Sequence, residues 1–144
     1  VSDMLRTLRT PIANAALRSA RNVSTAPPSA RNVSTAPPSA VKLHEVSPRD
    51  GLQNERTILT TSAKLELMRR LVAMGPASIE VTSFVRADMI PALADADSLC
   101  AQLWEQQWAL DARRAGMQFA GLLLNQRGFE RFLRADLDIG TVMI

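Results

Sequence analysis

The sequence has 144 residues, of which 47% are hydrophobic, so it is long enough for one domain with a buried core. Its single cysteine, Cys100, excludes an intrachain disulfide, and no apolar run reaches the length of about 18 residues that predicts a membrane-spanning helix. The net charge is +3, but residues 1–40 hold five arginines and one acid, whereas residues 41–144 hold twelve basic and thirteen acidic residues. Because the excess positive charge is confined to residues 1–40 and aromatic residues are few, we expect no nucleic-acid partner and no membrane partner.

Residues 1–40 form a predicted leader that is rich in Ala, Ser, Thr and Arg and nearly free of acid. This composition is typical of mitochondrial transit peptides, and the alternative is a disordered tail with no targeting role. The decapeptide Ser19–Pro28 is repeated without change as Ser29–Pro38. Stacking repeat folds need longer units and more copies, so we assign the repeat no function and exclude the leader from the fold.

The first predicted strand is Val41–Val46, and a polar segment containing Arg49, Asp50 and Gly51 follows it. An adjacent cation and carboxylate at the carboxyl end of a strand suit the active site of an α/β enzyme. The alternative interpretation is a surface ion pair of little energetic weight. A helix is predicted from Thr60 to Gly75, because apolar residues recur there at three- and four-residue spacing.

The second predicted strand, Ala77–Phe84, carries Glu80 among residues that are otherwise suited to burial. Either Glu80 lies at a solvated strand end, or it pairs with a cation on the neighbouring strand, for which Arg49 is the candidate. A long helix, either continuous or broken, is predicted over Pro91–Ala115, with Cys100 as a small buried hydrophobic residue.

A third strand is predicted at Met117–Leu124, followed by a helix from Gly128 to Leu133 and a fourth strand from Ile139 to Ile144. Alternating strands and helices imply an α/β fold with a parallel sheet, either doubly wound or part of a (β/α)8 barrel. No Gly-x-Gly-x-x-Gly follows the first strand, which disfavours a dinucleotide-binding fold. The barrel is favoured because polar residues follow three strands in succession: Arg49 and Asp50, Thr82 and Ser83, and Asn125.

Two strings in this order carry a family resemblance: Val46-Ser-Pro-Arg-Asp-Gly-Leu-Gln-Asn-Glu55 and Ile79-Glu-Val-Thr-Ser-Phe-Val85. They resemble the first two strand motifs of 3-hydroxy-3-methylglutaryl-CoA lyases, and Pro91–Ala96 and Asn125–Glu130 are similar to later parts of the same pattern. The chain departs from the pattern at Ser47, where the family usually has Gly, and at Leu123-Leu124-Asn125, where it has Thr-Pro-Asn or Val-Pro-Asn.

The resemblance implies a (β/α)8 barrel that cleaves 3-hydroxy-3-methylglutaryl-CoA to acetyl-CoA and acetoacetate with Mg or Mn, in mitochondrial leucine degradation and ketone-body formation. It implies that Arg49 binds the acyl-CoA substrate and stabilises the enolate, and that Asp50 ligates the metal. Glu80 is implied as a catalytic residue that orients Arg49, and Gln53 and Ser83 as substrate-binding residues. The full-length enzyme is expected to be a homodimer in the mitochondrial matrix.

The same resemblance implies residues that this sequence lacks: a His-x-His pair and an Asn from later strands, and a Cys on a Gly-rich loop. A typical barrel needs about 250 residues, and residues 41–144 supply roughly half of one. The sequence therefore predicts the N-terminal half of a (β/α)8 barrel, with about four strands and three helices, that is inactive alone. The alternatives are a synthase that condenses acyl-CoA, of the isopropylmalate or homocitrate type, and a catalytically dead half-barrel. The downstream coding sequence would distinguish a fragment from a dead half-barrel.

Overall fold

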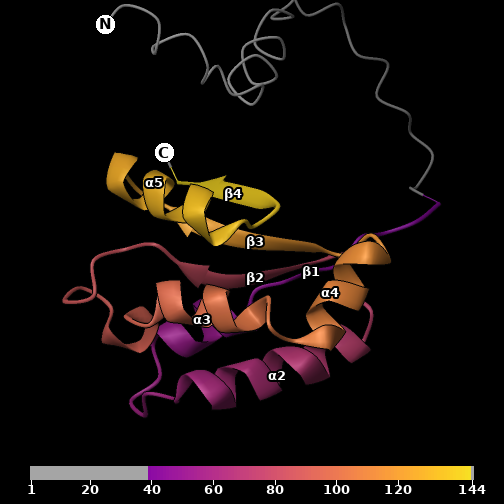
Figure 1. Ribbon diagram of the computed structural model, residues 1–144, viewed down its shortest axis with the longest axis horizontal. Coiled ribbons are helices and arrows are strands. Elements are labelled where there is room, and N and C mark those ends of the chain that lie inside the picture. The colour runs from indigo at the N-terminus through magenta and orange to yellow at the C-terminus, as the bar shows by residue number, and fades with distance from the viewer. Residues whose placement is uncertain (1–38, 144) are drawn as a thin grey trace, which may run out of the picture. The chain divides into compact units, whose positions relative to one another are not determined.

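A computed structural model describes residues 39–143 (Figure 1). The predicted leader lies outside these residues up to residue 38, as does the decapeptide repeat. The elements in chain order are β1 (His44–Glu45), the single wide helical turn η1 (Ser47–Gly51), α2 (Thr61–Ala73), β2 (Ser78–Ser83), the short 3-10 turn η2 (Pro91–Leu93), α3 (Ala96–Leu103), α4 (Gln107–Arg114), β3 (Gln118–Leu123), α5 (Gln126–Ala135) and β4 (Ile139–Val142).

The four strands form one parallel sheet in the order β1-β2-β3-β4, which confirms the predicted α/β class. A doubly wound sheet reverses its strand order at a switch point, whereas a barrel adds each strand beside the one before it. The strictly sequential order therefore selects the barrel architecture over the doubly wound sheet.

One apolar cluster joins the helices to one face of the sheet. It includes Met68 of α2, Ile79 and Val81 of β2, Leu99 of α3 and Phe119 of β3, all of them essentially inaccessible to solvent. Figure 1 shows α2, α3 and α4 grouped on one side of the strands. Because the helices cover this face, side chains on the other face of the sheet are the ones that lie inside a barrel.

Cys100 belongs to this cluster and is 1% exposed, as predicted. Burial raises the pKa of the Cys100 thiol to about 12, so the thiol stays protonated at neutral pH. Cys100 is a small apolar residue of the core here.

The helix boundaries follow local signals. Thr60 Oγ1 accepts a hydrogen bond from the Ala63 backbone N–H at 3.2 Å, which caps the start of α2. The chain leaves α2 through Gly75, whose φ of +76° is a conformation that glycine adopts without a steric penalty. No described helix is long and apolar enough to span a membrane.

The structure shortens one predicted element and divides another. The predicted strand Val41–Val46 pairs with β2 only at His44 and Glu45, because the chain turns into η1 directly after Val46. The long helix predicted over Pro91–Ala115 takes its broken form, with two α-helices that follow a 3-10 turn, so the described residues contain four α-helices. The break after Trp104 lets its indole N–H reach the Ala135 carbonyl at 2.8 Å.

Candidate active site

The centre of the candidate site is an ion pair between neighbouring strands. Arg49 lies in η1, just beyond β1, and Glu80 lies in the middle of β2. The Arg49 Nη2 and Nε atoms approach Glu80 Oε2 at 2.7 and 2.9 Å. The Glu80 side chain is 2% exposed and that of Arg49 is 12% exposed. Glu80 is therefore the buried partner of Arg49, and the alternative of a solvated strand end is wrong.

Asp50 holds the same guanidinium from the solvent side. Its Oδ1 accepts from Arg49 Nη1 at 2.6 Å, and its side chain is 57% exposed. Taken alone, the Arg49–Asp50 contact thus resembles the surface ion pair that was the alternative interpretation of these two residues. The buried Glu80 distinguishes it from an ordinary surface pair, because a charge-assisted bond in a dry setting holds the guanidinium in one orientation.

The turn η1 places Arg49 and Asp50 together. The Asp50 backbone N–H donates to the Val46 carbonyl at 2.7 Å, and Pro48, which is buried, starts the turn. Proline suits this position because it has no N–H to donate and its φ already matches a helical turn. Wide helical turns of this kind are rare and are often found at functional sites.

An irregularity in β2 changes which residues share the face of Glu80. In the register between β2 and β3, Glu80 lies beside Ala120 and Thr82 lies beside Gly121. Glu80 and Thr82 are two positions apart on β2, with Val81 between them, whereas their partners Ala120 and Gly121 are consecutive on β3. Val81 is therefore an extra residue in β2, and the strand contains a β-bulge at this point.

The bulge brings Ser83 onto the face that carries Glu80. Ser83 lies beside Leu122, and Leu122 shares a face of β3 with Ala120, the partner of Glu80. Without the bulge, alternation along the strand would have placed Thr82 on that face instead. Ser83 is fully buried, and its hydroxyl lies 3.4 Å from the Leu122 carbonyl.

In the described part of the chain, the other polar residues considered in the sequence form no hydrogen bond with the Arg49–Glu80 pair. Gln53 follows η1 and is half-buried, and no hydrogen bond joins its side chain to the rest of residues 39–143. Asn125 follows β3 as expected, but its Oδ1 accepts from the Gly128 backbone N–H at 2.8 Å and so caps α5. His44 hydrogen-bonds through Nδ1 to Ser78 Oγ at 2.7 Å, at the opposite end of β2 from Ser83.

The described residues do not by themselves form a metal site. Within residues 39–143 no group of three or more His, Cys, Asp or Glu side chains is arranged to hold an ion. Asp50 supplies one carboxylate that Arg49 already engages, and a hard cation such as Mg²⁺ takes six oxygen ligands in octahedral geometry. Asp50 can therefore be one ligand of a site whose other ligands lie elsewhere.

A buried lysine near the site was missed by the sequence reasoning. Lys64 of α2 is 2% exposed, and its Nζ donates to the Ala92 carbonyl at 2.7 Å and also bonds to Asp95 Oδ1. The Thr61 hydroxyl donates to the other oxygen of Asp95 at 2.8 Å. The available signal was position, because Lys64 lies four residues before Met68 and so falls on the buried face of α2.

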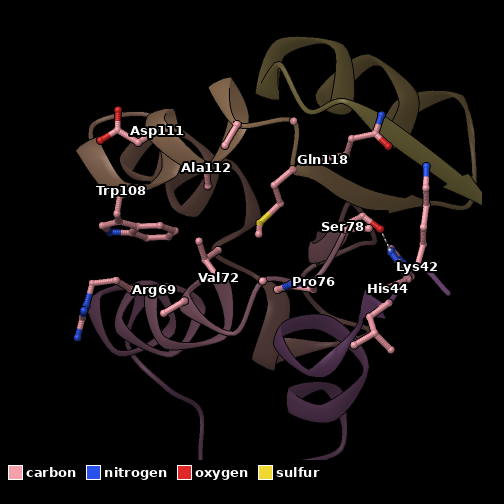
Figure 2. A pocket seen from close by; sticks show the side chains of 17 residues that line it. Lys42, His44, Arg69, Val72, Pro76, Ser78, Trp108, Asp111, Ala112 and Gln118 are labelled. Carbon is pink, nitrogen blue, oxygen red and sulfur yellow. Dashed lines mark hydrogen bonds between the residues drawn. The ribbon is translucent and has the colours of Figure 1, made fainter. Parts of the chain in front are cut away.

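A large cavity among the described residues lies away from the ion pair. It has a volume of about 850 Å³ and lies at the amino ends of β2 and β3 (Figure 2). Figure 2 shows Val72, Pro76, Trp108 and Ala112 around it, with Ser78 on its rim. Active sites of (β/α)8 enzymes form at the carboxyl ends of the strands, so the ion pair rather than this cavity is the candidate catalytic centre.

Comparisons with known proteins show which enzymes this chain resembles. No family model matches it. A hydroxymethylglutaryl-CoA lyase of Bacillus subtilis is 36% identical over 104 residues, which cover 72% of this chain and 32% of the relative. The mitochondrial hydroxymethylglutaryl-CoA lyase of Arabidopsis thaliana is 57% identical over 56 residues, 39% of this chain and 12% of the relative. An (R)-citramalyl-CoA lyase of Chloroflexus aurantiacus is 40% identical over 99 residues, 67% of this chain and 31% of the relative.

Solved structures agree with these sequence matches. The B. subtilis HMG-CoA lyase structure superposes with a TM-score of 0.63 at 36% identity, covering 73% of this chain and 33% of that one. An HMG-CoA lyase from Acinetobacter baumannii, in complex with coenzyme A and 3-methylmalate, gives a TM-score of 0.61 at 32% identity, covering 70% of this chain and 30% of that one. The chain spans about a third or less of the length of these proteins. Its motifs, its sheet order and these matches make it similar to the hydroxymethylglutaryl-CoA lyases over that part of their length.

Proposed function

We propose that residues 41–143 contribute the Arg49–Glu80 portion of an active site that cleaves 3-hydroxy-3-methylglutaryl-CoA to acetyl-CoA and acetoacetate. The observation that carries the proposal is the Arg49 guanidinium, which buried Glu80 holds at 2.7 Å beyond the carboxyl end of β1. A pre-oriented cation in a water-poor setting can stabilise negative charge that develops in a transition state. Carbon–carbon cleavage of this substrate develops such charge, as an enolate on the acetyl-CoA fragment.

Arg49 would bind the acyl-CoA substrate and stabilise the enolate. Glu80 would act through Arg49, since both guanidinium contacts go to its Oε2. Glu80 Oε1 is buried and has no hydrogen-bond partner among the described residues, so it remains able to accept a bond from a substrate group. Gln53 and Ser83 would contact the substrate, with Ser83 on the face of Glu80.

We propose Asp50 as one ligand of a divalent cation, Mg or Mn, whose other ligands lie outside residues 39–143. When bound, such a cation would supply Lewis-acid polarisation of substrate oxygens. Asp50 is suited to a single-ligand role because its carboxylate is more than half exposed and faces solvent beside Arg49.

Cellular placement and assembly complete the proposal. The leader-like composition of residues 1–40 supports a mitochondrial matrix enzyme of leucine degradation and ketone-body formation. Relatives named as mitochondrial include those of Arabidopsis thaliana and Rattus norvegicus, and other relatives are bacterial. We propose a homodimer for the full-length enzyme.

A chimeric enzyme tests the proposal. Residues 41–143 would replace the matched segment of the B. subtilis lyase, and acetyl-CoA release from 3-hydroxy-3-methylglutaryl-CoA would be measured with Mg²⁺. We expect an active chimera, and we expect R49K to lower kcat by about 10²-fold or more, because lysine keeps the charge but cannot form the fork to Glu80. R70K, at an exposed position on α2, is the matched control and should leave kcat unchanged. A folded chimera with no cleavage, or equal effects of R49K and R70K, would refute the proposal.

A second acyl group is worth assaying because the Chloroflexus aurantiacus relative, 40% identical over 99 residues, is named a citramalyl-CoA lyase. The chimera should therefore be offered (R)-citramalyl-CoA in parallel. A higher kcat/KM for that thioester would keep the Arg49 chemistry and change the substrate assigned to it.

A further inference from the structure

A second cavity, of about 520 Å³, lies where β2 and β3 end, and none of the residues proposed for the cleavage lines it. Segment 84–88 after β2 forms one wall and α5 forms another. Four arginines line it: Arg86, Arg127, Arg131 and Arg134. Two acids also line it, Asp88 and Asp97, so basic side chains outnumber acidic ones by two to one.

Three of these arginines share one face of α5. Arg127, Arg131 and Arg134 are spaced by four and three residues, which puts their side chains above one another on a helix. Like charges at this spacing destabilise a helix, so the arrangement is unfavourable unless a negative group offsets it. Negative groups along this face would offset the repulsion, and Asp97 supplies one of them for Arg131.

Arg131 is fixed in place at the wall of the cavity. Its Nε lies 2.9 and 3.1 Å from the two carboxylate oxygens of Asp97, and its Nη1 donates to the Val85 carbonyl at 3.0 Å. Its guanidinium lies 5.5 Å from the centre of the Phe84 ring. Asp97 therefore fixes the orientation of the Arg131 side chain, and it does not neutralise the other arginines of the cavity.

The acidic residues leave two arginines uncompensated. Asp88 pairs with Arg86, as Asp97 pairs with Arg131. Within residues 39–143 no ion pair engages Arg127 or Arg134. Both guanidinium groups are therefore available to a ligand that enters from solvent.

Glycine keeps the walls of the cavity close together. A Cβ atom at Gly128 would lie 2.9 Å from the Phe84 carbonyl oxygen, which is closer than carbon and oxygen tolerate. The start of α5 can thus rest against the end of β2 only because residue 128 has no side chain. This close approach brings Arg127 and Arg131 beside segment 84–88.

We propose that this cavity binds a phosphate or diphosphate group through Arg127 and Arg134, with Arg131 as a fixed neighbour. The planar guanidinium fork matches phosphate oxygens, and a cavity of this size accommodates a small ligand. The proposal does not depend on the lyase function. The phosphates of coenzyme A are one source of such a group, and free phosphate or diphosphate is the other.

Isothermal titration calorimetry of the 144-residue chain tests this, with pyrophosphate, coenzyme A and dephospho-coenzyme A as separate probes. The R127Q/R134Q variant removes two positive charges from the cavity and leaves the Arg131–Asp97 pair intact. The matched control, R70Q/R114Q, removes two positive charges from exposed positions on α2 and α4. We expect R127Q/R134Q to weaken pyrophosphate binding by about tenfold or more, as loss of charge-assisted bonds implies. The control should change it by less than about twofold at physiological salt, where distant exposed charges are screened.

The probes separate the two sources of phosphate. If R127Q/R134Q weakens coenzyme A more than dephospho-coenzyme A, the 3′-phosphate of the coenzyme is the natural ligand. If only pyrophosphate responds to the variant, the ligand is a free anion. No pyrophosphate binding, or equal weakening in the two double variants, overturns the proposal. An active chimera with unaltered phosphate affinity in R127Q/R134Q would refute this inference and leave the lyase proposal standing.

A measurement on the unmodified chain covers the case in which R127Q/R134Q does not fold. In a ¹H–¹⁵N NMR titration with pyrophosphate, we expect amide shifts confined to segment 84–88 and to residues 126–134. Shifts spread over α2 and α4 to the same extent would contradict a single site.

Discussion

At the scale of single residues, Arg49 is held unequally by its two carboxylates. Glu80 is buried and Asp50 is mostly exposed, although both lie within 2.7 Å of the guanidinium. An exposed pair is weakened by water and salt, whereas a buried charge that loses its partner pays a desolvation cost that nothing offsets. The two contacts should therefore contribute very differently to stability.

We predict that R49M destabilises the chain by about 3–5 kcal/mol, because Glu80 would remain as a buried charge without a partner. D50N should cost less than about 1 kcal/mol, because its contact with Arg49 is exposed. Urea denaturation followed by circular dichroism measures both free energies of unfolding. The double variant R49M/E80L replaces the buried pair by apolar side chains and should be more stable than R49M. Equal costs for R49M and D50N would mean that Glu80 is solvated.

The sequence predicted the proximity of Arg49 and Glu80 only as one of two interpretations, because a charged residue within a buried strand needs a partner unless it lies at a solvated strand end. The position of Ser83 relative to Glu80 could not be derived from alternation along the strand. Simple alternation puts Thr82 on the face of Glu80, and only the extra residue Val81 changes this. A bulge depends on the pairing with β3, and the sequence of β2 carries no signal for it.

At the scale of elements, the ion pair between Lys64 and Asp95 connects the segments that follow β1 and β2. The loop that carries Arg49 leads into α2, where Lys64 lies, and the loop after Ser83 leads to Asp95. Because this ion pair holds the end of one loop against the end of the other, it limits how far the two loops can move apart. The apolar periodicity correctly predicted helices at α2 and α3. It carries no signal for the ion pair between Lys64 and Asp95, which are 31 residues apart.

We predict that D95A destabilises the chain by about 3–5 kcal/mol, since it strands the ammonium of Lys64, which is 2% exposed. K64M should cost less, because Asp95 is 23% exposed and can be hydrated once its partner is gone. The control is D88A, which removes one partner of an exposed pair with Arg86 and should change stability by less than about 1 kcal/mol. Thermal and urea unfolding give the three values. If K64M were less stable than D95A, Asp95 rather than Lys64 would be the partner that cannot be hydrated when left alone.

At the scale of the whole molecule, the described sheet has two edges. Strand β1 has a neighbour only in β2, and β4 has a neighbour only in β3, within residues 39–143. Unpaired strand edges and exposed apolar residues such as Val142 and Met143 favour association with other chains. The alternation of elements predicted parallel strands, but it was compatible with both a doubly wound sheet and a barrel, so the sequential order comes from the structure.

We predict that the 144-residue chain, purified alone, shows no cleavage of 3-hydroxy-3-methylglutaryl-CoA with either Mg²⁺ or Mn²⁺. It places Arg49 beside Glu80, but its described residues contribute one exposed carboxylate to a metal, and the chain spans about a third of the length of the lyases that it matches. A coupled assay for acetyl-CoA measures this, with the B. subtilis enzyme as the positive control. The same preparation should run larger than a monomer in size-exclusion chromatography with light scattering, because its sheet edges are open. A monomeric chain with measurable cleavage would show that these residues form a complete site, so that Asp50 and its surroundings must hold the cation without help from further strands.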